Sequence, residues 1–220
     1  GRDSNRGSCA QPCRYQYALM EEKRPGEYFP VFEDETGTYI LNSRDMCMID
    51  HLPDLMEAGV DCIKLEGRAK SAYYAAIVTG AYRHGIDAAV QGDPLDPVWR
   101  DEVEHISHRL YSTGFYYGFP GQYTENSRYI RQWQICAIVL DCRKDGMATL
   151  SLRNKFAAGD HVELVGPDMR PFSFEAPVMQ DEYGACLTEP KTPQMRFSMQ
   201  LPQPVPPYSI LRRAVDLSAR

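Results

Sequence analysis

Two cysteines stand four residues apart near the start of the chain, in a polar segment that also contains arginines and glycines. Cys9 and Cys13 follow Arg6, and a third cysteine, Cys47, comes directly after the polar residues 42–45. Thiolates that loops present beside fixed positive charge are suited to bind a metal cluster or an anionic substrate. The sequence therefore indicates that the chemistry of this chain involves the thiolates of these cysteines.

The cysteine spacing leaves several kinds of site open. An iron–sulfur cluster needs several thiolates from different loops, and Cys9, Cys13 and Cys47 supply three of them. Structural zinc sites usually combine a close pair of ligands with a second pair nearby, so zinc ranks lower here. A pair of free or redox-active thiols is the remaining alternative. The other four cysteines are expected to be small buried apolar residues: Cys62, Cys136, Cys142 and Cys186.

A second charged cluster follows the apolar residues 60–65, which we expect to form a buried strand. It consists of Glu66, Arg68 and Lys70. One interpretation is an ion pair that holds the loop. The other is a carboxylate and cations that orient an anionic substrate, since arginine can bind a carboxylate through two hydrogen bonds. Functional residues of parallel α/β folds lie where strands end, which favours the second interpretation.

The surrounding pattern predicts α/β structure followed by all-β structure. Strands are expected over residues 28–33, 38–41 and 60–65, and helices from 43 or 44 to 59 and over 69–90. Residues 92–126 read as a linker. After residue 127, short strands separated by glycine-containing turns predict a small closed β-barrel. They are expected at residues 132–141, 147–153, 161–165, 176–180, 195–201 and 209–211.

The amino-acid composition is that of a globular protein without a membrane-spanning segment. The chain has 220 residues, 43% of them hydrophobic and 25% charged, which is ordinary for a globular protein. No apolar run approaches the roughly 20 residues of a membrane span. Seven unevenly spaced cysteines favour a reducing cytoplasm. The five histidines form no motif, and we expect His105 and His108 at the surface.

These same residues carry a resemblance to peptidase family U32, the collagenase-like peptidases. The similar strings are NRGSCAQPCR at residues 5–14, NSRDMC at 42–47, IKLEGR at 63–68 and KSAYY at 70–74. STGFY at residues 112–116 and RNKF–GD over 153–160 also look like family segments. The resemblance runs from residue 1 to about residue 213.

The resemblance implies a TIM-type barrel followed by a small β-barrel. On that basis residues 1–91 are the C-terminal part of a TIM-like α/β barrel, 92–126 a linker and 127–220 the β-barrel. The family includes peptidases and hydroxylases of tRNA, ribosomal RNA or ubiquinone precursors. Such hydroxylases carry a 4Fe–4S cluster, and the RNA-directed ones depend on prephenate. The family pattern makes Cys9 and Cys47 cluster ligands, with Cys13 the alternative, and the remaining ligands lie upstream.

The resulting hypothesis is a cytoplasmic iron–sulfur RNA hydroxylase, of which this chain is an inactive C-terminal portion. Arg6, Glu66 and Arg68 are expected to line its substrate pocket. A collagenase-like peptidase with a peptide substrate is the first alternative. The second is a β-domain that binds RNA or protein, with phosphate contacts from four basic residues: Arg131, Arg143, Arg153 and Lys155.

Overall fold

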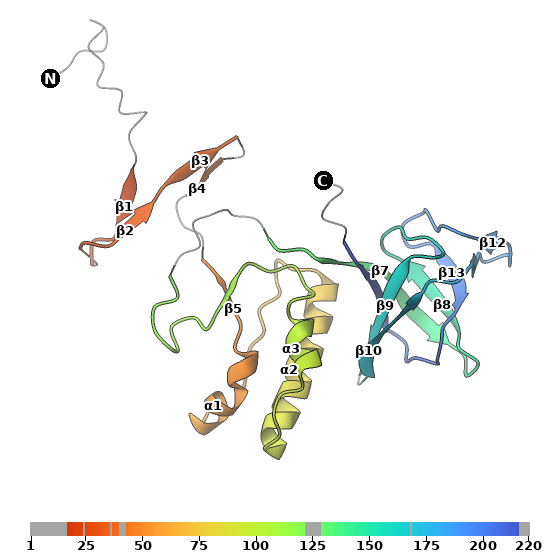
Figure 1. The fold of residues 1–220 in the computed structure, drawn as a ribbon, viewed down its shortest axis with the longest axis horizontal. Helices are drawn as coiled ribbons and strands as arrows, with labels where there is room; N and C mark the ends of the chain where they lie inside the picture. The colour runs from red at the N-terminus through yellow and green to blue at the C-terminus, as the bar shows by residue number, and fades with distance from the viewer. Residues whose placement is uncertain are drawn as a thin grey trace, which may run out of the picture. The chain divides into compact units, whose positions relative to one another are not determined.

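The computed structural model describes residues 17–23, 25–35, 37–39, 43–121, 129–167 and 169–215 (Figure 1). These residues fall into two compact units, and each is described by itself. The first unit takes its described residues from 17–46 and 109–121, and the second takes them from 47–108 and 129–215. No helix in the described residues is long and apolar enough to span a membrane.

The first unit is built from short paired strands. β1 (Ala18–Met20) pairs antiparallel with β2 (Tyr28–Pro30), and β3 (Phe32–Asp34) pairs antiparallel with β4 (Gly37–Tyr39). β5 (Asp45–Met46) and β6 (Tyr111–Ser112) pair in parallel. An ion pair supports this last pairing, because Arg109 Nε donates to Asp45 Oδ1 at 3.0 Å. The chain continues directly from β5 to Cys47.

Short and long helices open the second unit. A 3-10 helix (Ile49–His51) leads into α1 (Leu52–Glu57), and α2 (Ala72–Gln91) and α3 (Pro97–Glu102) follow. The Ser71 hydroxyl caps α2 by accepting from the Tyr74 backbone N–H at 3.2 Å. Gly92 ends the helix in the left-handed region at φ 75°. The sequence thus sets both ends of α2.

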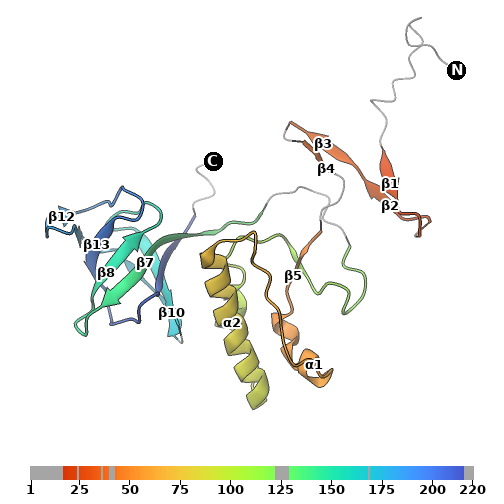
Figure 2. The ribbon, with the colours of Figure 1, turned by 180° about the vertical axis from the view of Figure 1, so that it is seen from behind.

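Close packing joins α2 to the segment before it, and Figure 2 shows α1 beside α2. The buried side chains of Ile49, Leu52 and Ile77 contribute to this interior. Gly85 allows the approach, because a Cβ there would lie only 2.6 Å from Leu52 Cδ1. A glycine in the middle of a helix is otherwise unfavourable, so tight packing explains this one.

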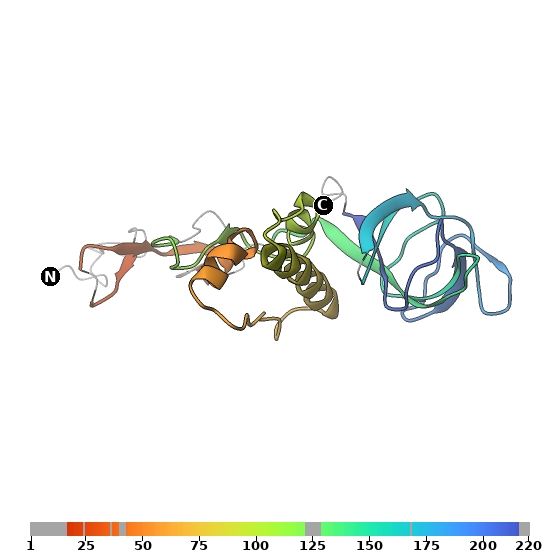
Figure 3. The ribbon, with the colours of Figure 1, turned by 90° about the horizontal axis from the view of Figure 1, so that it is seen from below.

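The rest of the second unit is one antiparallel sheet, which curls around its own core (Figure 3). Its strands follow the order β10-β9-β14-β7-β8-β13-β11-β12. Their bounds are β7 (Trp133–Cys142), β8 (Met147–Leu152), β9 (His161–Gly166), β10 (Met169–Glu175), β11 (Met179–Gln180), β12 (Cys186–Leu187), β13 (Arg196–Gln200) and β14 (Ile210–Ala214). Alternate residues of these strands fill the core, among them Val139, Leu150, Leu164, Phe197 and Leu211.

Several expected elements are confirmed. The hairpin around residues 34–37 forms as β3 and β4, and α2 begins three residues later and ends one residue later than expected. Most of the expected strands after residue 127 are present, which confirms the all-β character of this region. The ladder is open in the described residues, since no pairing joins its outer strands β10 and β12, whereas the sequence predicted a closed barrel.

Other expectations are wrong. Residues 60–65 form no strand, and Val60 and Leu65 are 41% and 37% exposed. A buried parallel strand needs neighbours on both sides, and the described residues provide none for this segment. The helix expected from residue 43 or 44 begins only at Ile49. Within the expected linker lie the helix α3 and the strand β6, which the sequence analysis missed.

Candidate functional site

Cys47 lies directly after the two-residue strand β5, within the span where the sequence predicted a helix. Its side chain is half-buried. The hydroxyl of Tyr82, on α2, donates to Cys47 Sγ at 3.7 Å and accepts from the Met48 backbone N–H at 2.8 Å. Burial raises the pKa of the Cys47 thiol, and hydrogen bonds from the Ile49 N–H and the Tyr82 hydroxyl offset only part of that rise.

This arrangement suits a metal-ligating sulfur. A half-buried sulfur with hydrogen-bond donors around it resembles a ligating thiolate, because such donors orient the ligand and tune its electronic properties. Cys47 therefore fits as one ligand of a cluster. The other candidate ligands, Cys9 and Cys13, lie outside the described residues, as does Arg6.

The remaining cysteines divide into two groups. Cys136 is fully buried, and burial raises the pKa of its thiol to about 12, as expected of a packing residue. Cys142 is partly buried in the same sheet. Cys62 and Cys186 are exposed, so the expectation that they are buried is wrong. Cys62 is exposed because residues 60–65 do not form the buried strand in which it was expected.

Glu66 and Arg68 occupy one exposed turn before α2. The carboxylate of Glu66 accepts a 2.7 Å hydrogen bond from the backbone N–H of Arg68, so these residues are linked through the main chain. The third member of the predicted cluster, Lys70, is partly buried, and its Nζ donates to the Ser107 carbonyl at 3.1 Å. The structure thus separates an exposed Glu66–Arg68 turn from a Lys70 that packs against the residues following α3.

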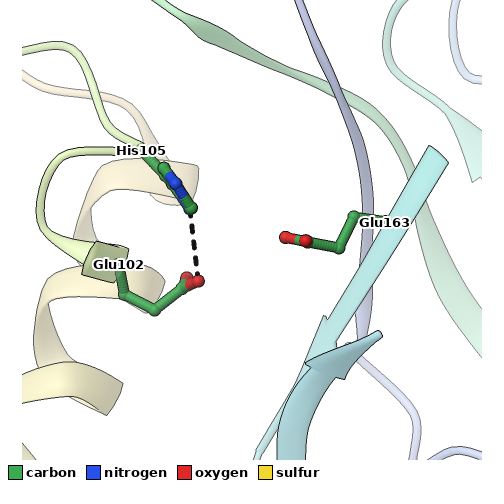
Figure 4. Close-up of side chains that lie close together, drawn as sticks. All are labelled: Glu102, His105 and Glu163. Atoms are coloured by element: carbon green, nitrogen blue, oxygen red, sulfur yellow. Dashed lines mark hydrogen bonds and ion pairs between the residues drawn. The ribbon is translucent and has the colours of Figure 1, made fainter. Parts of the chain in front are cut away.

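A buried ionic cluster, absent from the sequence predictions, lies between the helices and the sheet. Arg212 on β14 is fully buried, and its Nη1 donates to Glu102 Oε2 at 2.7 Å and to the Tyr73 hydroxyl at 3.2 Å. Its Nε donates to Glu163 Oε1 at 2.8 Å, and its Nη2 lies 3.1 Å from His105 Nδ1. Figure 4 shows Glu102, His105 and Glu163 converging from α3, the loop after it and β9.

The charge states in this cluster follow from burial and pairing. Burial raises the pKa of the Glu102 carboxyl, but hydrogen bonds from His105 and Arg212 outweigh it and leave the net pKa below the usual value. Burial also raises the pKa of the Tyr73 hydroxyl to about 12. Glu102 is therefore a carboxylate at neutral pH, and Tyr73 is a neutral phenol.

The donor set by itself resembles a metal site, since ligand atoms of Glu102, His105 and Glu163 lie within 4.8 Å of one another. Arg212 directs its guanidinium nitrogens at all three residues. A cation of this chain thus already satisfies the site, and we interpret it as a structural ion network.

Sequence reasoning missed this network for a clear reason. The residues that contact Arg212 lie 49 to 139 positions from it in the sequence, so no local motif predicts the network. His108, expected at the surface, is buried at 1% exposure, with its Nε2 3.1 Å from Glu104 Oε2. The available signal was a pair of arginines, Arg212 and Arg213, in a strand whose other residues are apolar, since strand alternation turns one of the two inward and a buried charge requires partners.

A cavity of about 530 Å³ lies beside the network, between α2, α3 and the sheet. Small residues of α2 line one wall, and Trp99 stacks on His84 with ring centroids 3.7 Å apart. Glu102 belongs to its lining, while Val165, Tyr208 and Ile210 form the opposite wall. The wall residues are predominantly apolar.

Two protein-family models together match nearly the whole chain. The family model for peptidase family U32 matches residues 1–126, which is more than half of the chain. The chain belongs to peptidase family U32. A second model, for the U32 C-terminal domain, matches residues 131–212. Arg212 is the last matched position, so the buried network joins Glu102 and His105 from the first matched region to Glu163 and Arg212 from the second.

The proteins similar to this chain include tRNA hydroxylation proteins and a collagenase. The tRNA hydroxylation protein P of Escherichia coli K12 is 31% identical over 250 residues, covering 92% of this chain and 54% of the relative. The tRNA hydroxylation protein P1 of Bacillus subtilis 168 is 31% identical over 221 residues, covering 96% and 52%. A collagenase of Porphyromonas gingivalis W83 is 30% identical over 118 residues, covering 52% and 27%.

The chain spans about half the length of the first two of these relatives. Among solved structures, the selenomethionine variant of the C-terminal domain of a Geobacillus thermoleovorans protein described as a U32 peptidase is 30% identical. The match covers 36% of this chain and 99% of that one, with a TM-score of 0.35.

Proposed function

We propose that the whole protein to which this U32 chain belongs is an iron–sulfur enzyme that hydroxylates tRNA. The observation that carries the proposal is the similarity to two tRNA hydroxylation proteins, which extends over 92% and 96% of the chain. Both U32 regions take part in this similarity, so it does not rest on a single motif. We place the enzyme in the cytoplasm, where its tRNA substrate is found.

The proposed cluster is 4Fe–4S, with Cys9 and Cys47 as ligands and Cys13 as the alternative ligand. Such a cluster supplies one-electron redox chemistry when it is bound. In this chain, Tyr82 orients the Cys47 sulfur through its hydroxyl and is itself fixed by the Met48 N–H. The half-buried position of Cys47 limits the access of water to the ligand.

The proposed substrate pocket contains Arg6, Glu66 and Arg68, with prephenate as the co-substrate. Glu66 and Arg68 share an exposed turn, so their charged groups are accessible to a ligand. A guanidinium is suited to a carboxylate such as those of prephenate. We further propose that residues 1–91 complete a TIM-type barrel, that 92–126 link it to the next domain, and that 127–220 form the β-domain.

The direct test is anaerobic cluster reconstitution of the full-length protein, followed by iron and sulfide analysis. Cys9→Ser and Cys47→Ser are expected to lower the iron content and the ultraviolet–visible absorption of the cluster. Cys62→Ser is the matched control, because Cys62 is exposed and has no proposed ligand role. Mass spectrometry of tRNA from a deletion strain, with and without the restored gene, then tests for hydroxylation. A protein that retains no iron, or tRNA that is identical in both strains, would contradict the proposal.

A collagenase-like peptidase is the second candidate, favoured by the 30% identity to the Porphyromonas gingivalis collagenase. That similarity covers only 52% of this chain, and the sequence has no HExxH zinc-peptidase motif. Gelatin cleavage by the purified full-length protein, abolished by a single pocket substitution such as Arg68→Ala, would favour this candidate over hydroxylation.

A further inference from the structure

Four exposed aromatic side chains gather in the loop that follows β6. This aromatic loop consists of Phe115, Tyr116, Tyr117 and Phe119, whose exposed fractions are 70%, 61%, 57% and 57%. Nowhere else in the described residues do four aromatic side chains that are more than half exposed lie within five positions of the sequence. Single exposed apolar residues are normal in a folded protein, whereas a cluster of them marks an interaction site.

A glycine and short hydrogen bonds shape the turn at the base of the aromatic loop. Gly114 has a φ of 61°, and its N–H donates to the Ser112 hydroxyl at 3.3 Å. A Cβ at Gly114 would lie 2.9 Å from Met46 Sδ, so glycine lets the loop lie this close to β5. The Tyr116 N–H donates to the Thr113 carbonyl at 3.4 Å. The backbone thus holds the base of the loop against β5 while the four rings remain exposed.

The composition of the aromatic loop and the tilt of its rings suit a flat, negatively charged ligand. Phe115 and Phe119 have ring centroids 6.1 Å apart and planes inclined by 50°, so the two rings meet at a tilt and do not cover each other's faces. Every large apolar side chain from residue 111 to 119 is aromatic, and residues 110–124 contain no charged side chain. The loop therefore offers flat rings and brings no carboxylate of its own to repel a phosphate.

We propose that the aromatic loop binds unpaired bases of an RNA by stacking. The proposal rests on the tRNA-directed function proposed above and adds a surface that holds the substrate. Every nucleobase has flat faces, and aromatic side chains stack on them with little dependence on the base sequence. Proteins reach such bases in single-stranded loops of an RNA. Protein partners also pack on aromatic side chains, and the similarity to two tRNA hydroxylation proteins favours RNA over them.

The aromatic loop begins beside the strand that leads to the proposed cluster ligand. Ser112 on β6 pairs with Met46 on β5, and the two strands run in parallel. Both strands therefore end at the same edge, where β6 continues into the aromatic loop and β5 continues into Cys47. Bases stacked on this loop are held at the end of the strand that directly precedes the proposed ligand.

The experiment measures binding of the full-length protein to fluorescently labelled bulk tRNA by anisotropy at several salt concentrations. Phe115→Leu and Tyr116→Leu keep an apolar side chain but remove the flat ring, so each is expected to weaken binding about fivefold or more. Phe115→Tyr keeps a ring and should bind like the original protein. Because these substitutions change no charge, the slope of log K against log salt should stay the same. Tyr183→Leu is the matched control, since it removes a ring that is 94% exposed from the turn between β11 and β12.

Absence of tRNA binding by the original protein, or an equal loss in Phe115→Leu and Tyr183→Leu, overturns the proposal. Thermal unfolding of the same full-length variants tests the other occupant. If the rings pack against another part of the protein, Phe115→Leu lowers the unfolding midpoint and leaves tRNA binding of the folded variant unchanged, which also overturns it.

These outcomes are separable from those of the proposed function. Binding that depends on the aromatic loop, together with tRNA that stays unhydroxylated, supports the loop and contradicts the hydroxylase. Normal hydroxylation together with binding that does not depend on the loop supports the hydroxylase and contradicts the loop. Circular dichroism confirms that each variant is folded at the temperature of the binding measurement.

Discussion

The buried guanidinium of Arg212 reaches from β14 to α3 and donates from Nη1 to Oε2 of Glu102 at 2.7 Å. Arg212 is fully buried, and Glu102 is 2% exposed. Burying two charges costs free energy, which their attraction offsets only while both are present. Replacing one partner therefore leaves the other as an unpaired buried charge and destabilises the fold. Since Glu163 and Tyr73 share the same guanidinium, the pair also fastens the helices to the sheet within the second unit.

Replacing Arg212 with methionine should therefore destabilise the protein strongly. The variant leaves the buried carboxylate of Glu102 and the partly buried carboxylate of Glu163 without their cation, and breaking a buried ion pair costs about 3–5 kcal/mol in comparable cases. The measurement is urea-induced unfolding monitored by circular dichroism. Arg143→Met is the matched control, because it removes an arginine from the exposed pair with Asp145 and should change the unfolding midpoint little. Equal midpoints for the two variants would show that the network contributes no special stability.

The same network predicts a dependence of stability on pH. The pKa of Glu102 is lower in the folded chain than its ordinary value, so the unfolded state binds a proton more readily. Its contribution to stability is complete above the ordinary glutamate value of about 4.3 and is lost as pH falls through the folded value. Glu102→Gln should flatten the acid limb of a plot of unfolding free energy against pH. A Glu102→Gln curve that runs parallel to the original curve at every pH would refute this assignment.

The limits of sequence-based prediction are physical and can be seen in particular residues. The ends of α2 were predictable because Ser71 and Gly92 act locally, within one turn of the helix. The strand expected over residues 60–65 fails because a parallel strand is defined by neighbours rather than by its own apolar residues. Arg212 and Glu102 are 110 residues apart, so only the folded chain reveals their pairing. The strand β5 before Cys47 was not predicted, because two residues form a strand there only through their pairing with residues 111–112.

Two glycines of α2 provide a test of the packing between α1 and α2. Gly85→Ala should destabilise the chain by about 1–3 kcal/mol, because the new methyl group would lie 2.6 Å from Leu52 Cδ1. Gly80→Ala is the matched substitution in the same helix, where nothing lies within 4 Å of the added Cβ. It should stabilise the helix by up to about 1 kcal/mol, since alanine loses less backbone entropy than glycine. Thermal unfolding of both variants should give shifts of opposite sign, and shifts of the same sign would be incompatible with the packing described here.

Alkylation rates should reveal the surroundings of Cys47. Because burial raises the pKa of its thiol, Cys47 should react with iodoacetamide more slowly than the exposed Cys62 at neutral pH. Tyr82→Phe removes a hydrogen bond that lowers the pKa of Cys47, so the rate at a given pH should fall further. Peptide mass spectrometry separates the two cysteines, and Cys62 serves as the internal reference in every sample.

The Tyr82 substitution also separates two effects of the hydroxyl. In Tyr82→Phe the Met48 N–H loses its 2.8 Å acceptor, so local opening around Cys47 becomes easier and would by itself speed alkylation. Rates measured across pH distinguish the two effects, since a higher thiol pKa shifts the rate profile toward alkaline pH, whereas opening raises the rate at every pH. A profile for Tyr82→Phe that shifts toward acid would show that Tyr82 does not stabilise the thiolate of Cys47.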